Sequence, residues 1–387
     1  MRIWIVILFL GIAFQLTAQD EKPKKWALGG YVKDLQSIFL FHDPLDLTLT
    51  DNLIHHRLNF KWFPDQHWQF KAELRNRIFW GETVKLTPGF GDMIDDANND
   101  IWDLSLVLVN KDAAVIHAML DRLYLEFVTG NLEMRFGRQR INWGQNLVWN
   151  PNDWFNAYSF SDFDYEERPG ADALRVQYYT GVASSIELVV KSYTSDFDNW
   201  VGGFVWRFNK AKYDFQIQAG YVQRDLALGA GWAGSIGNAG FKGEISYFQP
   251  HREGLTDDWS IIASTEFDYS FKNALYLAGA FLFNSNGEVN GNINDLLFAE
   301  LSAKNLYPFR YSFLIQAGYP ITPLMNIAGF VVYSPGSANA LFVNPAVTYS
   351  IAENWDLDFV TQFAFANNGQ QYKAPFQLFF LRLKFSY

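Results

Sequence analysis

Residues 68–80 read WQFKAELRNRIFW, a run in which apolar and polar side chains alternate. The apolar parity, with Asn76 as its exception, consists of Trp68, Phe70, Ala72, Leu74, Ile78 and Trp80. The other parity carries the polar side chains of Gln69, Lys71, Glu73, Arg75 and Arg77. A period of two over this length predicts a β-strand with one apolar face and one ionic face.

The same alternation recurs along the chain, from the stretch 57–62 to the stretch 241–247. Aromatic residues make up 18% of the chain, yet the mean hydropathy is only −0.09, so apolar residues are dispersed between polar ones. Tryptophan at both ends of the apolar row in 68–80 is typical of the aromatic girdles of outer-membrane barrels. Because every backbone donor and acceptor in lipid must be paired internally, strands of this kind can cross a membrane only as a closed barrel.

We therefore expect an all-β fold, a transmembrane antiparallel up-and-down β-barrel that forms one domain over residues 19–387. The alternating segments predict about 18 strands, with 16 as the alternative, because 101–111 and 296–307 fit either a strand or a loop. Short connections, such as 63–66 and 129–131, take turns with long ones. Outer-membrane barrels have short turns on the periplasmic side and long loops on the extracellular side, and the alternation of short and long connections matches this arrangement. The long connections are 42–50, 81–112, 142–170, 249–257 and 284–308.

The amino-terminal 18 residues have the pattern of a secretory signal peptide. Arg2 precedes the apolar run 3–14, which is shorter than the roughly 20 residues of a membrane helix, and Ala18 is the expected cleavage site. Removing residues 1–18 moves the net charge from −10 to −11, because Arg2 is the only charged residue removed. An acidic chain with dispersed cations is a poor nucleic-acid binder, and the lack of cysteine excludes disulfides. We expect the mature protein in the outer membrane of a Gram-negative bacterium, in contact with lipid.

The closing strand ends on an aromatic residue. Phe379, Leu381, Leu383, Phe385 and Tyr387 share one parity, and Arg382 and Lys384 lie on the other. This ending resembles the signal by which the barrel-assembly machinery recognises its clients, so that machinery is an expected partner.

The inward parity predicts a polar pore lining, and the region 132–179 stands out from the rest of the chain. Strict alternation would place Arg138 and Arg140 in lipid, which is costly, so we expect a β-bulge at Gly137 that turns both inward and Ile141 and Trp143 outward. The alternative is that both arginines lie level with the outer headgroups. The expected pore-lining residues are Arg57, Lys61, Lys71, Glu73, Arg75, Arg77, Arg122, Tyr124, Glu126, Arg135, Arg138, Arg140, Arg175 and Gln177.

The connection 142–170 is too long and too aromatic for a simple solvated loop. We expect it to fold into the lumen as a constriction, with Trp149, Trp154 and Phe155 against the wall and acidic side chains opposite the arginines. Facing rows of opposite charge would favour small polar or charged solutes. In the alternative interpretation the same ions pair with one another and plug the barrel. The expected constriction residues are Trp149, Asp153, Trp154, Asp162, Asp164, Glu166, Glu167 and Arg168.

The stretch from Gly137 to Gly144, GRQRINWG, resembles the Gly-Arg-Gln-x-Ile-x-Trp-Gly region of porin-like outer-membrane barrels and, more distantly, of alginate-export barrels. The resemblance extends to Tyr319–Leu324 and to the closing strand. It implies a monomeric transport barrel and names no substrate, and the Asn-Pro-Asn content of 149–156 departs from the alginate exporters.

The sequence therefore predicts a porin-like channel for passive passage of small polar or charged solutes. The alternative is a sealed barrel that acts as a structural or accessory subunit of an outer-membrane complex. We expect no enzyme, because none of the six histidines lies in a hydrolase motif. We also expect no cofactor, because the GAGWAG run at 229–234 matches a dinucleotide motif without its helix. No metal site is expected, although Asp92, Asp95, Asp96 and Asp100 offer oxygen ligands of the kind that calcium takes.

Overall fold

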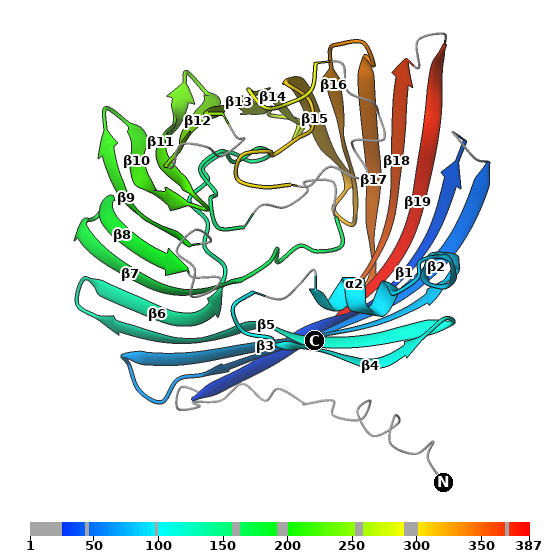
Figure 1. Ribbon diagram of the computed structural model, residues 1–387, viewed down its shortest axis with the longest axis horizontal. Helices are drawn as coiled ribbons and strands as arrows, with labels where there is room; N and C mark the ends of the chain where they lie inside the picture. The colour runs from blue at the N-terminus through cyan, green and yellow to red at the C-terminus, as the bar shows by residue number, and fades with distance from the viewer. Residues whose placement is uncertain are drawn as a thin grey trace.

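One antiparallel sheet closes on itself to form a barrel. The computed structural model describes residues 25–42, 46–96, 100–156, 163–191, 200–251, 258–289, 301–367 and 371–387. The predicted signal peptide lies outside these residues. Figure 1 shows the strands as a ring in which β1 lies beside the last strand, β19. The first ten strands are β1 (Trp26–Phe41), β2 (Leu47–Trp62), β3 (Trp68–Gly81), β4 (Ser105–Lys111), β5 (Ala114–Thr129), β6 (Leu132–Gln139), β7 (Ala171–Gly181), β8 (Ser184–Lys191), β9 (Val201–Lys210) and β10 (Tyr213–Val222). The others are β11 (Asp225–Ile236), β12 (Ala239–Pro250), β13 (Ser260–Ser270), β14 (Tyr276–Asn284), β15 (Tyr311–Thr322), β16 (Met325–Ser334), β17 (Ala340–Ala352), β18 (Trp355–Asn367) and β19 (Tyr372–Ser386).

Eighteen strands make the closed wall. β4 is an extra strand that pairs only with β5, along the first part of that strand, Ala114–Met119. The ring closes where β1 pairs with β19, from Tyr31 opposite Ser386 to Phe41 opposite Phe376. The predicted count of about 18 is confirmed, and the ambiguous stretch 101–111 contains the extra strand. Its counterpart 296–307 is described only from residue 301 and forms an isolated bridge there.

The two faces of the wall invert the pattern of a water-soluble protein. On β3 the side chains of Glu73, Arg75 and Arg77 are buried, whereas Ile78 and Trp80 are exposed. Farther round the wall Phe136 is 58% exposed and Ile315 is 68% exposed. Exposed apolar side chains around a polar interior are what a barrel in lipid requires. Along β3 the alternation therefore predicted correctly which residues face outward.

The two ends of the barrel differ. The end at which β1 begins and β19 finishes has tight turns, such as 130–131 and 353–354, and we call it the turn end. The other end carries the long connections, and the one between β3 and β4 includes the helices α1 (Glu82–Leu86) and α2 (Phe90–Asp96). Neither of these helices, the two in the described part of the chain, is long and apolar enough to cross a membrane.

The predicted bulge at Gly137 is absent. The register of β6 with both β5 and β7 continues through Gly137 without a shift. A register shift occurs instead between β3 and β5, where Glu73 faces Arg122 and the next residue of β3 faces Leu120. Asp121 is the extra residue of this bulge, and it brings a second charged group next to Arg122 on the inner wall.

Candidate functional site

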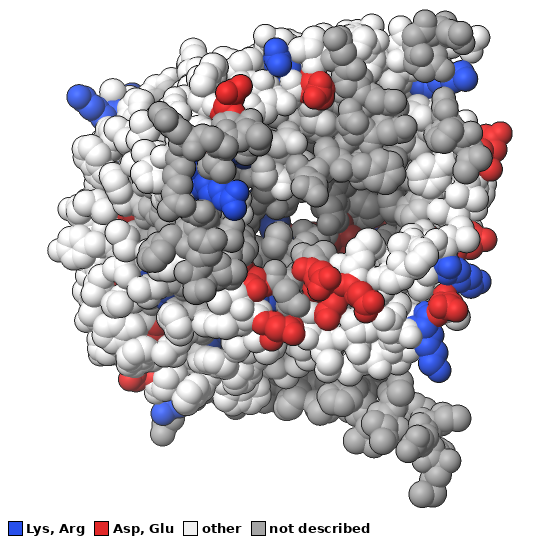
Figure 2. Space-filling model, in the orientation of Figure 1, with Lys and Arg blue, Asp and Glu red and all other residues white. Residues whose placement is uncertain are grey.

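The chain between β6 and β7 enters the barrel. We call its described parts, 140–156 and 163–170, the inward segment. Figure 1 shows the connection from β6 to β7 inside the ring, away from the strands that precede and follow it. The face drawn in Figure 2 is hollowed near its centre, and Asp and Glu side chains gather there over α2.

Two glutamates of the far wall anchor the first part of the inward segment. Glu244 on β12 accepts backbone N–H bonds from Gln145, from Asn146 at 2.7 Å and from Asn152 at 2.9 Å. Glu266 on β13 accepts two more, from the backbone N–H groups of Leu147 at 2.7 Å and Val148 at 2.9 Å. Both carboxylates are buried. Five backbone donors are thus held by two side chains, which satisfies polar groups that have no strand partner.

Aromatic packing reinforces this anchor. Trp143, Trp149, Trp154 and Phe155 are almost fully buried and belong to one apolar cluster with residues of the inner wall. The Trp143 ring centroid lies 4.8 Å from that of Phe155, and the Trp149 centroid lies 5.8 Å from that of Tyr307. The expectation that the aromatic residues pack against the wall therefore agrees with the structure.

Ile141 and Trp143 were expected to point outward, and this was wrong. Each is 1% exposed inside the barrel, and the Trp143 Nε1–H donates to Glu187 on β8 at 2.8 Å. The regular strand ends at Gln139. Beyond that residue the backbone leaves the wall, so the alternation between lipid and lumen no longer applies.

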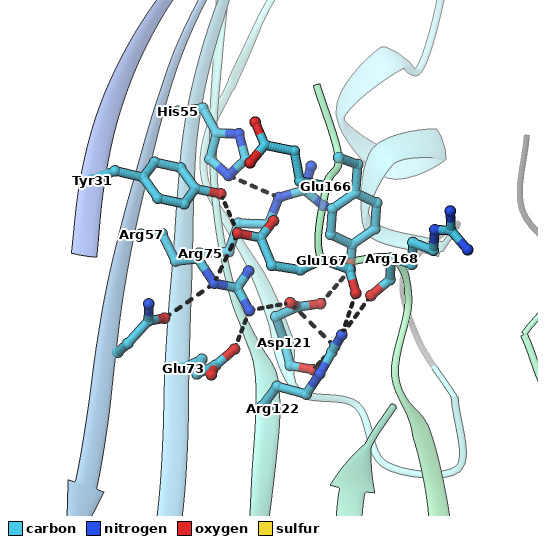
Figure 3. Close-up of polar contacts among 12 residues, drawn as sticks. Tyr31, His55, Arg57, Glu73, Arg75, Asp121, Arg122, Glu166, Glu167 and Arg168 are labelled. Carbon is cyan, nitrogen blue, oxygen red and sulfur yellow. Dashed lines mark hydrogen bonds and ion pairs between the residues drawn. The ribbon is translucent and has the colours of Figure 1, made fainter. Parts of the chain in front are cut away.

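The second part of the inward segment contacts a basic stretch of wall made by β1, β2, β3, β5 and β19. Figure 3 labels residues of the first four of these strands. Asp164 pairs with Lys33 at 3.5 Å and with Arg382 at 3.5 Å, and its Oδ2 lies 3.1 Å from Nδ1 of His55. Glu166 contacts the same two cations at 3.3 and 3.2 Å. It also pairs with Lys384 at 3.1 Å.

Arg57 is the centre of this anchor. It contacts Glu73, Asp121 at 2.6 Å and Glu167 at 3.7 Å, and its side chain is fully buried. The Tyr31 hydroxyl donates to Glu167 at 2.8 Å. Figure 3 shows these groups converging from neighbouring strands on the inward segment. A further guanidinium, Arg122, donates to the backbone carbonyls of Glu167 at 2.7 Å and Arg168 at 2.6 Å.

Tyr165 lies between a cation and an anion. The guanidinium carbon of Arg75 lies 3.8 Å from its ring centroid, and its hydroxyl donates to Asp121. Burial and the negative charge of Asp121 raise the pKa of Tyr165 to about 12. Burial alone would raise the pKa of Asp164, but the hydrogen bond from His55 and the charge of Lys33 outweigh it and hold that pKa well below its usual value. The hydroxyl of Tyr165 therefore remains protonated at neutral pH, and Asp164 remains ionised.

These contacts alter the expected picture of two separated charged rows. Asp164, Glu166 and Glu167 contact the cations of the wall directly. For these three residues this agrees with the alternative interpretation, in which the ions of the lumen pair with one another. Asp162 lies outside the described residues. Two buried arginines of β3 contact histidines of neighbouring strands: Arg75 donates to His55 at 3.2 Å and Arg77 donates to His117 at 3.2 Å. Within the described residues neither of them forms an ion pair with a carboxylate.

Arg138 does not reach the lumen through a bulge. It keeps the parity of the exposed Phe136 and pairs with Asp172, its register partner on β7, through two contacts of 2.8 Å. It also donates to the carbonyl of Trp102. The charge of Arg138 is thus neutralised and covered by protein. The bulge was predicted because a charge in lipid is costly, and this ion pair removes that cost.

The remaining predicted lining residues lie mostly nearer the turn end. Arg140 pairs with Asp153 at 2.6 Å, and burial raises the pKa of Asp153 although the positive charge of Arg140 opposes this. Arg175 contacts Glu133 and Gln177, and Arg135 contacts Glu126. Lys71 contacts Glu73 and lies 5.9 Å from the ring centroid of Tyr124, whereas Lys61 is exposed near the turn end of β2.

A pocket of about 380 Å³ lies beneath the inward segment on its turn-end side. Residues 140–145 of the inward segment contribute to its lining, and the strands β6 to β10 contribute the rest. Arg135, Arg140 and Arg175 are the predicted lining residues that the structure brings together there.

Several anchoring residues were not among the predicted site residues. Lys33, His55 and Arg382 hold the acidic part of the inward segment, and Glu244 and Glu266 hold the aromatic part. All five belong to the inward parity of their strands, so a complete reading of that parity would have found them. In the acidic run 92–100, Asp95 contacts Ser105 and Asp100 contacts Lys191. In the described part of the chain no three His, Asp or Glu residues are grouped so as to hold a metal ion.

Solved outer-membrane porins match the fold of this closed 18-strand wall over almost the whole chain. OccAB4 of Acinetobacter baumannii matches with a TM-score of 0.59 and 11% identity, over 94% of this chain and 98% of its own. Two Pseudomonas aeruginosa structures match with a TM-score of 0.58. They are OccK3 (OpdO), at 9% identity over 93% and 95% of the two chains, and OpdQ, at 8% identity over 94% and 99%.

No protein-family model and no curated protein sequence matches the chain. At these identities the similarity concerns the fold. The expected likeness to porin-like barrels is supported at that level, whereas these structures lend no support to the likeness to alginate-export barrels.

Proposed function

We propose that this protein is a channel of the Gram-negative outer membrane that passes small polar or charged solutes, with the inward segment as its constriction. One observation carries the proposal. A single segment is anchored to two regions of the inner wall, by Glu244 and Glu266 in one and by Arg57 in the other, while the outer wall is apolar. A partition held to the wall by polar side chains, inside a barrel with an apolar outer face, suits a size- and charge-selective passage.

The charge pattern refines the proposal. Most lumenal cations are paired with carboxylates. The electric field at the constriction therefore comes from the charges that have no partner of opposite sign. Arg75 and Arg77 lack a carboxylate partner within the described chain, and they favour anionic or dipolar solutes next to the inward segment. The dense pairing of the other ions favours the second candidate, a sealed barrel that serves as an accessory subunit of an outer-membrane complex.

Single-channel recording in planar lipid bilayers separates the two functions. A channel gives discrete current steps, and replacing both Arg75 and Arg77 with glutamine is expected to shift its ion selectivity toward cations. Gln69→Leu, on the same strand but nearer the turn end, is the matched control and is expected to leave selectivity unchanged. A barrel that inserts and gives no steps would reject the channel and favour the sealed subunit.

Processing and assembly complete the proposal. We infer that residues 1–18 are removed after Ala18 and that the barrel-assembly machinery recognises the closing strand up to Tyr387. We also favour a monomer. The mass of the protein purified from outer membranes tests the cleavage site, and deletion of Tyr387 is expected to lower the amount of assembled barrel.

A further inference from the structure

The pocket on the turn-end side of the inward segment has the size of a small-ligand site. Its volume of about 380 Å³ lies at the lower end of the roughly 300–1,000 Å³ typical of such sites. We call it the arginine–glutamate pocket, after lining residues of β6 to β9: Glu133, Arg135, Arg175, Glu187 and Arg207.

The pocket lining holds four arginines and two glutamates, and two more carboxylates outside the lining complete the ion pairs: Glu126 contacts Arg135, and Asp153 contacts the fourth arginine, Arg140. Arg175 contacts Glu133 at 2.7 Å and Glu187 at 2.9 Å. Arg135 contacts Glu133 at 3.0 Å, and Arg207 contacts Glu187 at 2.9 Å. A compact anion in this pocket would be repelled by two carboxylates although the guanidinium groups attract it. A cation would be repelled by the guanidinium groups although the carboxylates attract it. The pairing therefore disfavours a strongly charged ligand of either sign.

The same residues present donors and acceptors side by side. The Gln216 side-chain nitrogen donates to the backbone carbonyl of Trp143 at 2.7 Å, which fixes the orientation of the amide. Its Oε1, on a side chain that is 99% buried, has no donor in the described part of the chain, and neither has the Oε1 of Gln145. Buried acceptors without a donor are costly, so both oxygens suit a ligand that brings O–H groups.

We infer that the arginine–glutamate pocket binds a small neutral polyhydroxylated solute, of the size of a mono- or disaccharide. A hydroxyl group donates and accepts at once, so it matches guanidinium donors that alternate with carboxylate and amide acceptors. The pocket lies on the turn-end side of the inward segment, so it is a binding step next to the constriction. This inference rests on the proposed channel function and names a solute class for it.

The test is interruption of single-channel current by added solutes. Glucose and maltose are the neutral probes, and gluconate is the anionic probe of similar size. We expect maltose and glucose to interrupt the wild-type current in a saturable manner, with gluconate at least roughly tenfold weaker. Gln145→Leu and Arg207→Met are each expected to weaken maltose binding roughly tenfold, the loss of one good hydrogen bond in a buried site. Gln69→Leu, which removes a lumenal amide outside the pocket, is the matched control.

Gluconate binding as tight as that of glucose would overturn the inference, and so would equal maltose interruption in the wild type and both pocket variants. If the barrel carries no current, the channel proposal fails by itself. The pocket is then tested by titration calorimetry of the detergent-solubilised protein with maltose. Binding that is lost in Arg207→Met and kept in Gln69→Leu would uphold the pocket, and the absence of binding heat would refute it.

Discussion

Glu244→Gln is the substitution that most directly tests how the inward segment is held. The carboxylate accepts three backbone N–H groups, those of Gln145, Asn146 and Asn152. Glutamine has the same shape but presents one oxygen and one NH₂ group. Its oxygen can still accept from the first two amides, and its NH₂ then faces the Asn152 N–H, donor against donor.

The cost follows from these three bonds. A buried N–H left without an acceptor costs about 1–3 kcal/mol, and each surviving bond loses the benefit of an ionised acceptor, about 0.5–1 kcal/mol. We expect the docking of residues 145–152 to weaken by about 2–5 kcal/mol, which is ~30- to ~4,000-fold in the equilibrium between docked and detached segment. The strand ladders are untouched, so the barrel itself should remain folded.

Hydrogen–deuterium exchange read by mass spectrometry measures this change, because the three amides are themselves the reporters. We expect faster exchange in peptides that cover 140–156 and unchanged exchange in the strands of the wall. Glu353→Gln, an exposed substitution in the turn between β17 and β18, is the control. Exchange of residues 145–152 within twofold of the wild type would refute the argument that Glu244 holds the segment.

Three further predictions concern the basic anchor, the outer wall and pH. Arg57→Met leaves the buried carboxylates of Glu73 and Asp121 without their shared cation, and we expect a loss of about 3–5 kcal/mol in urea unfolding from lipid vesicles. Wild-type stability in that variant would contradict the assignment of Arg57 as the centre of the anchor. Ile315→Arg places a charge on the exposed outer face, and a cost of about 2–4 kcal/mol is expected in vesicles if this face meets the lipid midplane. No measurable cost would argue against a lipid-facing wall. The pKa of Asp164 is lowered by its docked contacts, so these contacts stabilise docking above the free-carboxyl value of about 3.9. That stabilisation is lost as pH falls through the lower, docked-state pKa. Exchange of residues 163–168 should therefore stay slow from pH 7 to about 5 and accelerate only below about pH 4, and acceleration near pH 6 would exclude this carboxyl as the cause.

Periodicity made most of the wall predictable. Within a strand the direction of a side chain depends only on local backbone geometry, so Arg75 inside and Leu74 outside follow from their positions in the alternation. The same rule failed at Ile141 and Trp143, because the strand ends at Gln139 and the following backbone is no longer pleated. It also misplaced the bulge. A bulge depends on how two strands are paired, and the extra residue, Asp121, belongs to β5 and not to the strand that contains Gly137.

The sequence by itself determined the barrel, the faces of its strands and the unusual character of the 142–170 connection, because each of these depends on residues close together in the chain. Only the tertiary structure decided which ions meet. Asp164 contacts Lys33, 131 residues away, and Asn146 contacts Glu244, 98 residues away. Such pairs exist because a closed wall brings distant strands around one segment, and no local pattern contains that geometry.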